Sequence, residues 1–326
     1  MEPASKKAFH KVISLCLRTG IITLACWFIY SKVFHHPGLS SFPDLSFSFG
    51  AREIFLLVIS FAMMFLNWGL EIVKWKMLVS SRAEMSWKRA GKGVLAGLAI
   101  SIATPNRAGE FAGRIFFLDK QHRVEGMYLS LAGSAAQLFV TLFTAALAAL
   151  FIKAGWNAEL LSRNGTVHFI ALIALLAFSF CMLLLFLLPY LLKDTAASGS
   201  KWIAAMDGLN RLGLRMLSRV TMISFLRYFI FFLQFHFLLN IFHAEISLHE
   251  TLVLIPLTFF AISVIPTVAF TEVGLRGTAA VLLLGPFCAQ PSSAMEASFV
   301  LWVMNVAVPA LIGCFFIPSM KIFSGT

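Results

Sequence analysis

The chain alternates long apolar runs with short polar connections. A bilayer core about 30 Å thick requires roughly 20 apolar residues for each crossing helix. The runs are continuously apolar rather than alternating, and lipid offers no partner for backbone polar groups, so they predict helices and not barrel strands. Six crossings are predicted, at residues 12–33, 54–76, 127–152, 169–192, 220–242 and 297–318.

Two further apolar segments are interrupted near their middle. Residues 93–118 are broken by Thr-Pro-Asn-Arg-Ala-Gly-Glu at 104–110, and residues 252–284 are broken between Pro266 and Gly277. Because basic residues flank the first segment on both sides, we predict a re-entrant hairpin that enters from the cytoplasm and returns there; a broken full crossing is the alternative. The predicted fold class is therefore an all-α polytopic membrane protein, with one integral membrane domain over residues 1–326.

Composition and charge agree with this pattern. Of the 326 residues, 59% are hydrophobic and 13% are charged, and the net charge is +11. The basic residues gather in short loops beside apolar runs, as between Lys74 and Lys92, which by the positive-inside rule places these loops and both termini in the cytoplasm. No recognition motif accompanies the charge, which argues against nucleic-acid binding. Residues 201–219 are amphipathic and predict a helix on the inner membrane surface.

The two interrupted segments resemble one another at an offset of about half the chain. We predict that the second hairpin dips from the outside, so that residues 1–165 and 166–326 form an inverted repeat of the kind found in transporters. The matching residues are Pro105, Glu110 and Arg114 in the first segment and Pro266, Glu272 and Arg276 in the second.

The interruptions have the composition of an anion site. Proline ends an incoming half-helix, and glycine lets the chain turn before a new half-helix begins. The positive end of the new half-helix attracts anions, and Arg107, Arg114 and Arg276 add positive charge beside it, so a phosphate headgroup is the expected ligand. The residues predicted to shape the turns are Pro105, Gly109, Pro266, Gly274 and Gly277.

Acidic and basic residues in both segments stand four positions apart. Glu110 can therefore pair with Arg114, and Glu272 with Arg276, on one helix face. Mutual neutralisation is the structural explanation, because charges within a membrane are costly. A role in a substrate path is the alternative, favoured because Arg107 has no obvious local partner.

Other polar residues lie within the predicted crossings. Glu71 and Arg227 are expected to pair with each other or to reach the interface by snorkelling. For Gln137, Asn240 and Asn305 we expect hydrogen bonds between helices, because an unpaired amide in lipid seeks a partner. Lining a cavity is the alternative role for these side chains.

The motifs at 104–110 with Arg114, together with Ile265-Pro266 and Glu-Val-Gly-Leu-Arg-Gly at 272–277, resemble the lysylphosphatidylglycerol synthase transmembrane region, a flippase-like domain family. The stretch Leu226-Arg227-Tyr228 with Gln234 is also similar to that family. The resemblance covers most of the chain. It implies a protein of the bacterial cytoplasmic membrane that moves, or helps to move, a lipid with a polar headgroup between leaflets.

The resemblance has limits that matter for function. In the best-known relatives an attached soluble domain makes an aminoacylated lipid; this chain ends at Thr326, so we expect no aminoacyl transfer. The second motif also departs from the family pattern, in which more glycines precede the arginine and an acidic residue follows it. The resemblance therefore does not assign the headgroup.

The leading hypothesis is flippase-like translocation of a phosphate-bearing lipid of the phospholipid or polyprenyl type. The alternatives are a membrane-embedded lipid or glycan transferase, and a non-transporting accessory subunit of a lipid or glycan synthesis system, with a glycosyltransferase or lipid synthase as its partner. We expect no catalytic residue, metal or cofactor, because the acids outside the motifs are isolated and the histidines lack a ligand pattern. The residues predicted to bind the lipid are Glu71, Arg107, Glu110, Arg114, Arg227, Glu272 and Arg276.

Overall fold

The computed structural model describes residues 50–102, 104, 107–153, 165–191, 212–265 and 269–320, together with a few positions between 19 and 31. Within these ranges the chain forms helices and turns and no strand. The helices are α2 (Ala51–Val79), α3 (Trp87–Ile102), α4 (Gly109–Ile115), α5 (Arg123–Lys153), α7 (Gly165–Leu191), α9 (Gly213–Ile241), α10 (Leu248–Val264), α11 (Ala269–Leu283), α12 (Pro291–Trp302) and α13 (Val308–Cys314).

Four helical stretches in the described part are long and apolar enough to cross a membrane. They are Ala51–Val79, Lys120–Ile152, Arg215–Ile241 and Pro291–Cys314, and they correspond to four of the six predicted crossings. A fifth prediction falls on α7, and most of the first, at 12–33, lies outside the described residues. Large apolar side chains on the outer faces, such as Phe65, Leu176 and Met222, are exposed, as a lipid-facing surface requires.

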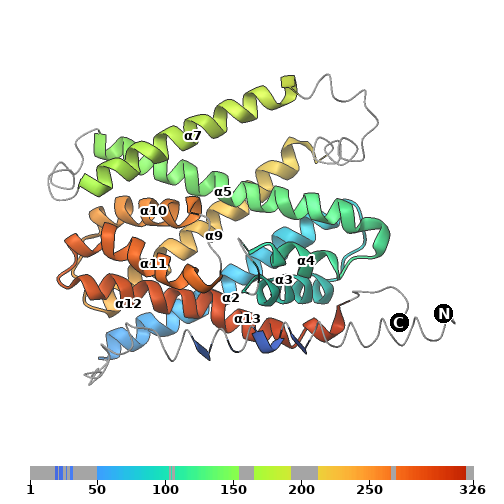
Figure 1. Cartoon of the computed structure of the whole chain (residues 1–326), viewed down its shortest axis with the longest axis horizontal. Helices are drawn as coiled ribbons and strands as arrows, with labels where there is room; N and C mark the ends of the chain where they lie inside the picture. Colours follow the sequence, from blue (N-terminus) through green and yellow to red (C-terminus); the bar gives the residue numbers. More distant parts are fainter. Residues whose placement is uncertain are drawn as a thin grey trace.

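The described helices pack in two groups on either side of the helix pair α2 and α9 (Figure 1). In one group α3 packs against α4 and α13. In the other group α11 packs against α12, α10 packs against α5, and α5 also packs against α7. Helices α2 and α9 pack against each other between the groups. The candidate site described below lies where α2, α5 and α9 meet the two broken segments.

One predicted boundary is wrong. The amphipathic stretch 201–219 was expected to be a separate surface helix that ends before a crossing at 220. The structure instead has α9 running without interruption from Gly213 to Ile241, because no proline or glycine follows Gly213 to break it. Residues 201–211 lie outside the described residues.

The first broken segment folds as a tight pair of helices. A Cβ atom added to Gly113 of α4 would lie 2.0 Å from the Cα of Gly97 in α3, and one added to Gly97 would lie 2.7 Å from the carbonyl oxygen of Glu110. The two backbones therefore touch, which only glycine permits, as at small-residue contacts between membrane helices. Gly109 has the same role, since its Cβ would lie 2.6 Å from the backbone of Ile100.

The second broken segment differs from the prediction in where its helix starts. Helix α11 begins at Ala269, so Glu272, Gly274 and Gly277 lie inside the helix and not in the turn. A Cβ added to Gly274 would meet nothing within 4 Å. The prediction that Gly274 and Gly277 shape the turn is therefore wrong: a four-residue link between α10 and α11 is enough, and Pro266, like Pro105, lies outside the described residues.

The last crossing contains a widened turn. Residues Val303–Ala307 form a π-helical turn between α12 and α13, two residues before Pro309. Proline lacks the N–H that would bond to the carbonyl of Asn305, so the regular helical ladder is interrupted here. The helix thereby consists of two rods joined at Asn305.

Candidate functional site

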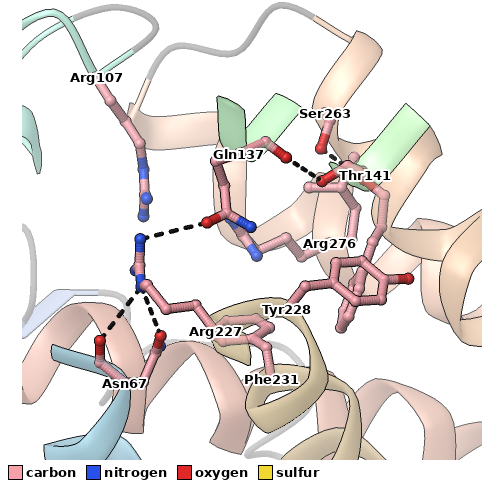
Figure 2. Close-up of a pocket in the computed structure, with 11 residues that line it drawn as sticks. Asn67, Arg107, Gln137, Thr141, Arg227, Tyr228, Phe231, Ser263 and Arg276 are labelled. Carbon is pink, nitrogen blue, oxygen red and sulfur yellow. Dashed lines mark hydrogen bonds between the residues drawn. The ribbon is translucent and has the colours of Figure 1, made fainter. Parts of the chain in front are cut away.

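A polar cleft lies between α2, α5, α9, α11 and the residues that precede α4. It comprises two overlapping cavities of about 190 Å³ and about 360 Å³, a size suited to a small ligand or headgroup. Figure 2 shows the smaller cavity with its lining side chains. Among the residues predicted to bind the lipid, those that line the cleft are Glu71, Arg107, Glu110, Arg114, Arg227 and Arg276.

The deep end of the cleft is formed by Glu71, Lys74 and Arg114, which we call the inner cluster. Glu71 lies 2.9 Å from Lys74 Nζ and 2.8 Å from Arg114 Nη2, and these three side chains are only 2–4% exposed. Lys74 also donates to the carbonyl of Gly133 in α5, at 3.3 Å, and Arg114 donates to Ser130 Oγ, at 3.2 Å. Charges at this depth are tolerated because they are paired and hydrogen-bonded.

The position of Lys74 corrects the sequence prediction. It was expected in the cytoplasmic loop at the end of the 54–76 crossing, but it is buried within α2, which extends to Val79. The reason is local: Lys74 stands one turn after Glu71, and their i,i+3 spacing puts both on the inward face. That spacing was the signal that could have identified it.

The accessible part of the cleft is lined by Arg107, Glu110, Arg227 and Arg276. Glu272 does not line either cavity but pairs with Arg107 and Arg276, and we call these five residues the outer cluster. Their side chains are 12–32% exposed. The two predicted pairs are present: Glu110 lies 3.4 Å from Arg114, and Glu272 lies 2.9 Å from Arg276. The expectation that Glu71 and Arg227 pair is also confirmed, because Arg227 Nη1 donates to the Glu71 carboxylate.

Arg107 joins the two broken segments. It lies 3.1 Å from Glu272 of α11 and 3.7 Å from Glu110 of α4. The expectation that Arg107 has no local partner is therefore wrong, because Glu110 stands three positions after it. The Glu272 contact comes from the distant half of the sequence, which local spacing cannot indicate. Arg107 also has a φ of 56°, a left-handed backbone conformation that is unfavourable for residues other than glycine. Residues in such strained conformations are concentrated at functional sites.

Arg227 is held from a second side by amides. Its Nε donates to Asn67 Oδ1 at 2.9 Å and to the Asn67 carbonyl at 3.2 Å, and its Nη1 lies 3.4 Å from Gln137 Oε1. In Figure 2 the guanidinium groups of Arg227 and Arg107 point toward one another across the cavity. Like charges aimed at one point repel unless an anion lies between them.

Amides from three helices support this arrangement. Asn67 donates to Asn305 Oδ1 at 3.2 Å, and Asn305 donates to Gln234 Oε1 at 3.2 Å. The expected hydrogen bonds between helices are therefore confirmed for Asn305 and also for Gln137, which reaches the Ser224 carbonyl of α9. The expectation is wrong for Asn240, which donates to the His236 carbonyl of its own helix at 2.8 Å.

One wall of the cleft is apolar. Phe231, Phe259 and Ile262 line the smaller cavity beside Arg227 and Arg276. Phe231 and Phe259 pack edge to face with ring centroids 5.5 Å apart, a favourable aromatic geometry. Phe259 and Ile262 could not be identified from the sequence, because nothing distinguishes them from the other apolar residues of α10. The cleft therefore offers a charged end and an apolar side to one ligand.

The charges in the cleft do not balance. The inner and outer clusters together, with Glu272 counted because it pairs with two of the lining arginines, contain five positive and three negative side chains, which leaves an excess of two positive charges. The positive residues are Lys74, Arg107, Arg114, Arg227 and Arg276, and the negative residues are Glu71, Glu110 and Glu272. Uncompensated charge away from water is costly, so this cleft is suited to an anion.

Comparison with known proteins identifies the family. No curated protein and no solved structure matches the chain. The family model described as the lysylphosphatidylglycerol synthase TM region matches residues 15–313, a range that includes both broken segments and every residue of the cleft. This confirms the resemblance drawn from the motifs. The chain therefore belongs to the lysylphosphatidylglycerol synthase transmembrane-region family, as a multi-pass integral membrane protein with a role in lipid-related processes.

Proposed function

We propose that the protein moves a phosphate-bearing lipid, of the phospholipid or polyprenyl type, between the two leaflets of the bacterial cytoplasmic membrane. The observation that carries the proposal is the pairing of excess positive charge with an apolar wall in one cleft. The phosphate binds to Arg107, Arg227 and Arg276, because guanidinium groups bind phosphate through paired hydrogen bonds. The hydrocarbon chain lies against Phe231 and Phe259.

The two broken segments form the path in this proposal. The α3–α4 pair is re-entrant from the cytoplasm and the α10–α11 pair is re-entrant from the outside, within one domain whose halves, 1–165 and 166–326, form an inverted repeat with both termini in the cytoplasm. In support, each broken pair lies along the chain between two long apolar helical stretches: α2 and α5 flank the first pair, and α9 and the stretch Pro291–Cys314 flank the second. The ion pair between Arg107 and Glu272 then lies where the two half-paths meet.

The proposal is tested with purified full-length protein in vesicles. A fluorescent phospholipid in the outer leaflet is quenched by a reagent that cannot cross the membrane, and the protected fraction reports movement between leaflets. We expect Arg227→Ala and Arg276→Ala to slow this movement by at least about tenfold, the effect of losing one charge-assisted hydrogen bond in a site.

Arg82→Ala is the matched control. Arg82 pairs with Glu125 at 3.1 Å and lies outside the cleft, so its removal also breaks an arginine–carboxylate pair but leaves the proposed site intact. We expect wild-type movement in this variant. Equal movement in all three variants and the wild type would refute the proposed role of the cleft.

A further inference from the structure

The number of excess positive charges in the cleft restricts the charge of the headgroup that can neutralise them. Within the inner and outer clusters together the surplus is two positive charges. A phosphodiester with one negative charge leaves one positive charge uncompensated, whereas a phosphate monoester or a diphosphate brings two negative charges and leaves none. Electrostatic complementarity of this kind decides between ligands of similar shape.

The surplus is divided between the two clusters. The inner cluster keeps one positive charge in excess, since Glu71 faces both Lys74 and Arg114, and these side chains are sealed from solvent. The outer cluster also has one in excess, with three arginines and two carboxylates. A ligand in the outer cluster therefore experiences the surplus of both, because the shielding between buried charges is weak.

The existing partners of the arginines in the outer cluster leave each of them able to bind an anion. Arg227 is oriented by the fixed amides of Asn67 and Gln137, so it is ready for a ligand without rearrangement. Arg107 and Arg276 share the single carboxylate of Glu272. Since one carboxylate cannot satisfy two guanidinium groups fully, an incoming phosphate can bind Arg107 without leaving Glu272 unpaired.

From this arrangement we propose that the cleft selects phosphate groups that carry two negative charges, as in a phosphate monoester or a diphosphate, over phosphodiesters with one. This selection rests on the proposed function, because it names the headgroup class for the same site. Binding also transfers Arg107 from Glu272 to the ligand, which weakens the link between the two broken segments.

The test compares three probes on the full-length protein in detergent by titration calorimetry. They are a short-chain phosphatidic acid, which is a monoester, a phosphatidylglycerol with the same chains, which is a diester, and inorganic phosphate. At pH 8 we expect the monoester lipid to bind at least about tenfold more tightly than the diester lipid, the effect of one added charge interaction.

The pH dependence of the ligand provides a second arm. A phosphate monoester loses its second proton at a pKa of roughly 6, so at pH 5 it carries about one negative charge, whereas the diester carries one at both pH values. We expect the preference for the monoester to disappear at pH 5. The diester corrects for any titration of the protein itself.

Two variants of one ion pair shift the selection in opposite directions. Arg276→Gln lowers the surplus to one charge and should reduce the preference for the monoester, whereas Glu272→Gln raises the surplus to three charges and should increase it. Arg82→Gln, outside the cleft, should behave as the wild type. Thermal unfolding of each purified variant shows whether it is folded before its affinities are compared.

The outcomes separate this inference from the proposed function. Equal affinity for monoester and diester at both pH values overturns the selection but leaves transport of a phosphate-bearing lipid in place. Binding of neither lipid overturns both. If inorganic phosphate binds as tightly as the monoester lipid, the site does accept two negative charges. The proposal that a lipid headgroup supplies them is then overturned.

Discussion

The two broken segments carry the same acid–base spacing but are held in different ways. In the first, α3 and α4 touch backbone to backbone at Gly97 and Gly113, and Arg114 is anchored to Glu71 of α2. In the second, the space beside Gly274 is open, and within the described part of the chain Arg276 forms its ion pair with Glu272 of its own helix. Helix α11 packs more extensively against α12 than against α10.

This difference separates two roles that the sequence motif alone does not distinguish. A hairpin with touching backbones and a buried ionic anchor forms a rigid support, because close-packed interiors do not deform gradually. A hairpin with open space and accessible charges can change its contacts at lower cost. We therefore expect the first segment to fix the site and the second to respond to the ligand.

The largest effect is expected from removing the anchor of the first segment. Glu71→Gln leaves Lys74 and Arg114 buried without their carboxylate, which should lower the free energy of unfolding by about 3–5 kcal/mol. Glu272→Gln is the matched change in the second segment. Because Arg107 and Arg276 are partly exposed there, it should cost about 1 kcal/mol or less. Unfolding in mixed detergent and denaturant measures both, and equal losses would remove the distinction between the two segments.

An intermediate effect is expected from crowding the first pair of helices. Gly113→Ala places a methyl group 2.0 Å from the Cα of Gly97, so α3 and α4 must separate. Overpacking of this kind should destabilise the protein by about 1–3 kcal/mol. A shift in the unfolding midpoint of the purified protein reports it, and an unchanged midpoint would show that the two backbones do not touch.

The smallest effect, of opposite sign, is expected at an open glycine position of the second segment. Gly274→Ala adds a methyl group where nothing lies within 4 Å, inside helix α11. Alanine favours a helix over glycine by about 1 kcal/mol, so the variant should unfold at an equal or higher denaturant concentration. Destabilisation similar to that of Gly113→Ala would mean that both segments are equally close-packed.

The sequence predicted most of the helices and the pairs within each motif, because both depend on local spacing. Apolar runs mark the crossings, and the i,i+4 separation places Glu110 against Arg114 and Glu272 against Arg276. Contacts between distant segments were not accessible in this way. The partner of Arg107 is the example: Glu272 reaches it only because the two broken segments meet in the fold.

The errors have physical causes that are specific to each residue. Lys74 was placed in a loop because lysine after an apolar run usually marks the cytoplasmic side, but a carboxylate one turn earlier outweighs that tendency. Asn240 was expected to bond between helices, but the carbonyl of His236 on its own helix was nearer. A polar residue in a crossing therefore takes the first adequate partner, and sequence does not reveal which one that is.

The widened turn at Val303–Ala307 makes the final crossing a hinged element rather than a single rod. Its first part, α12, packs against α11, and its last part, α13, packs against α3. Any tilt of the second segment relative to the first must therefore bend the chain at this turn, where the missing N–H of Pro309 already lowers the resistance to bending. Asn305 sits at the pivot and bonds to Asn67, so such a tilt would also pull on the amide that orients Arg227.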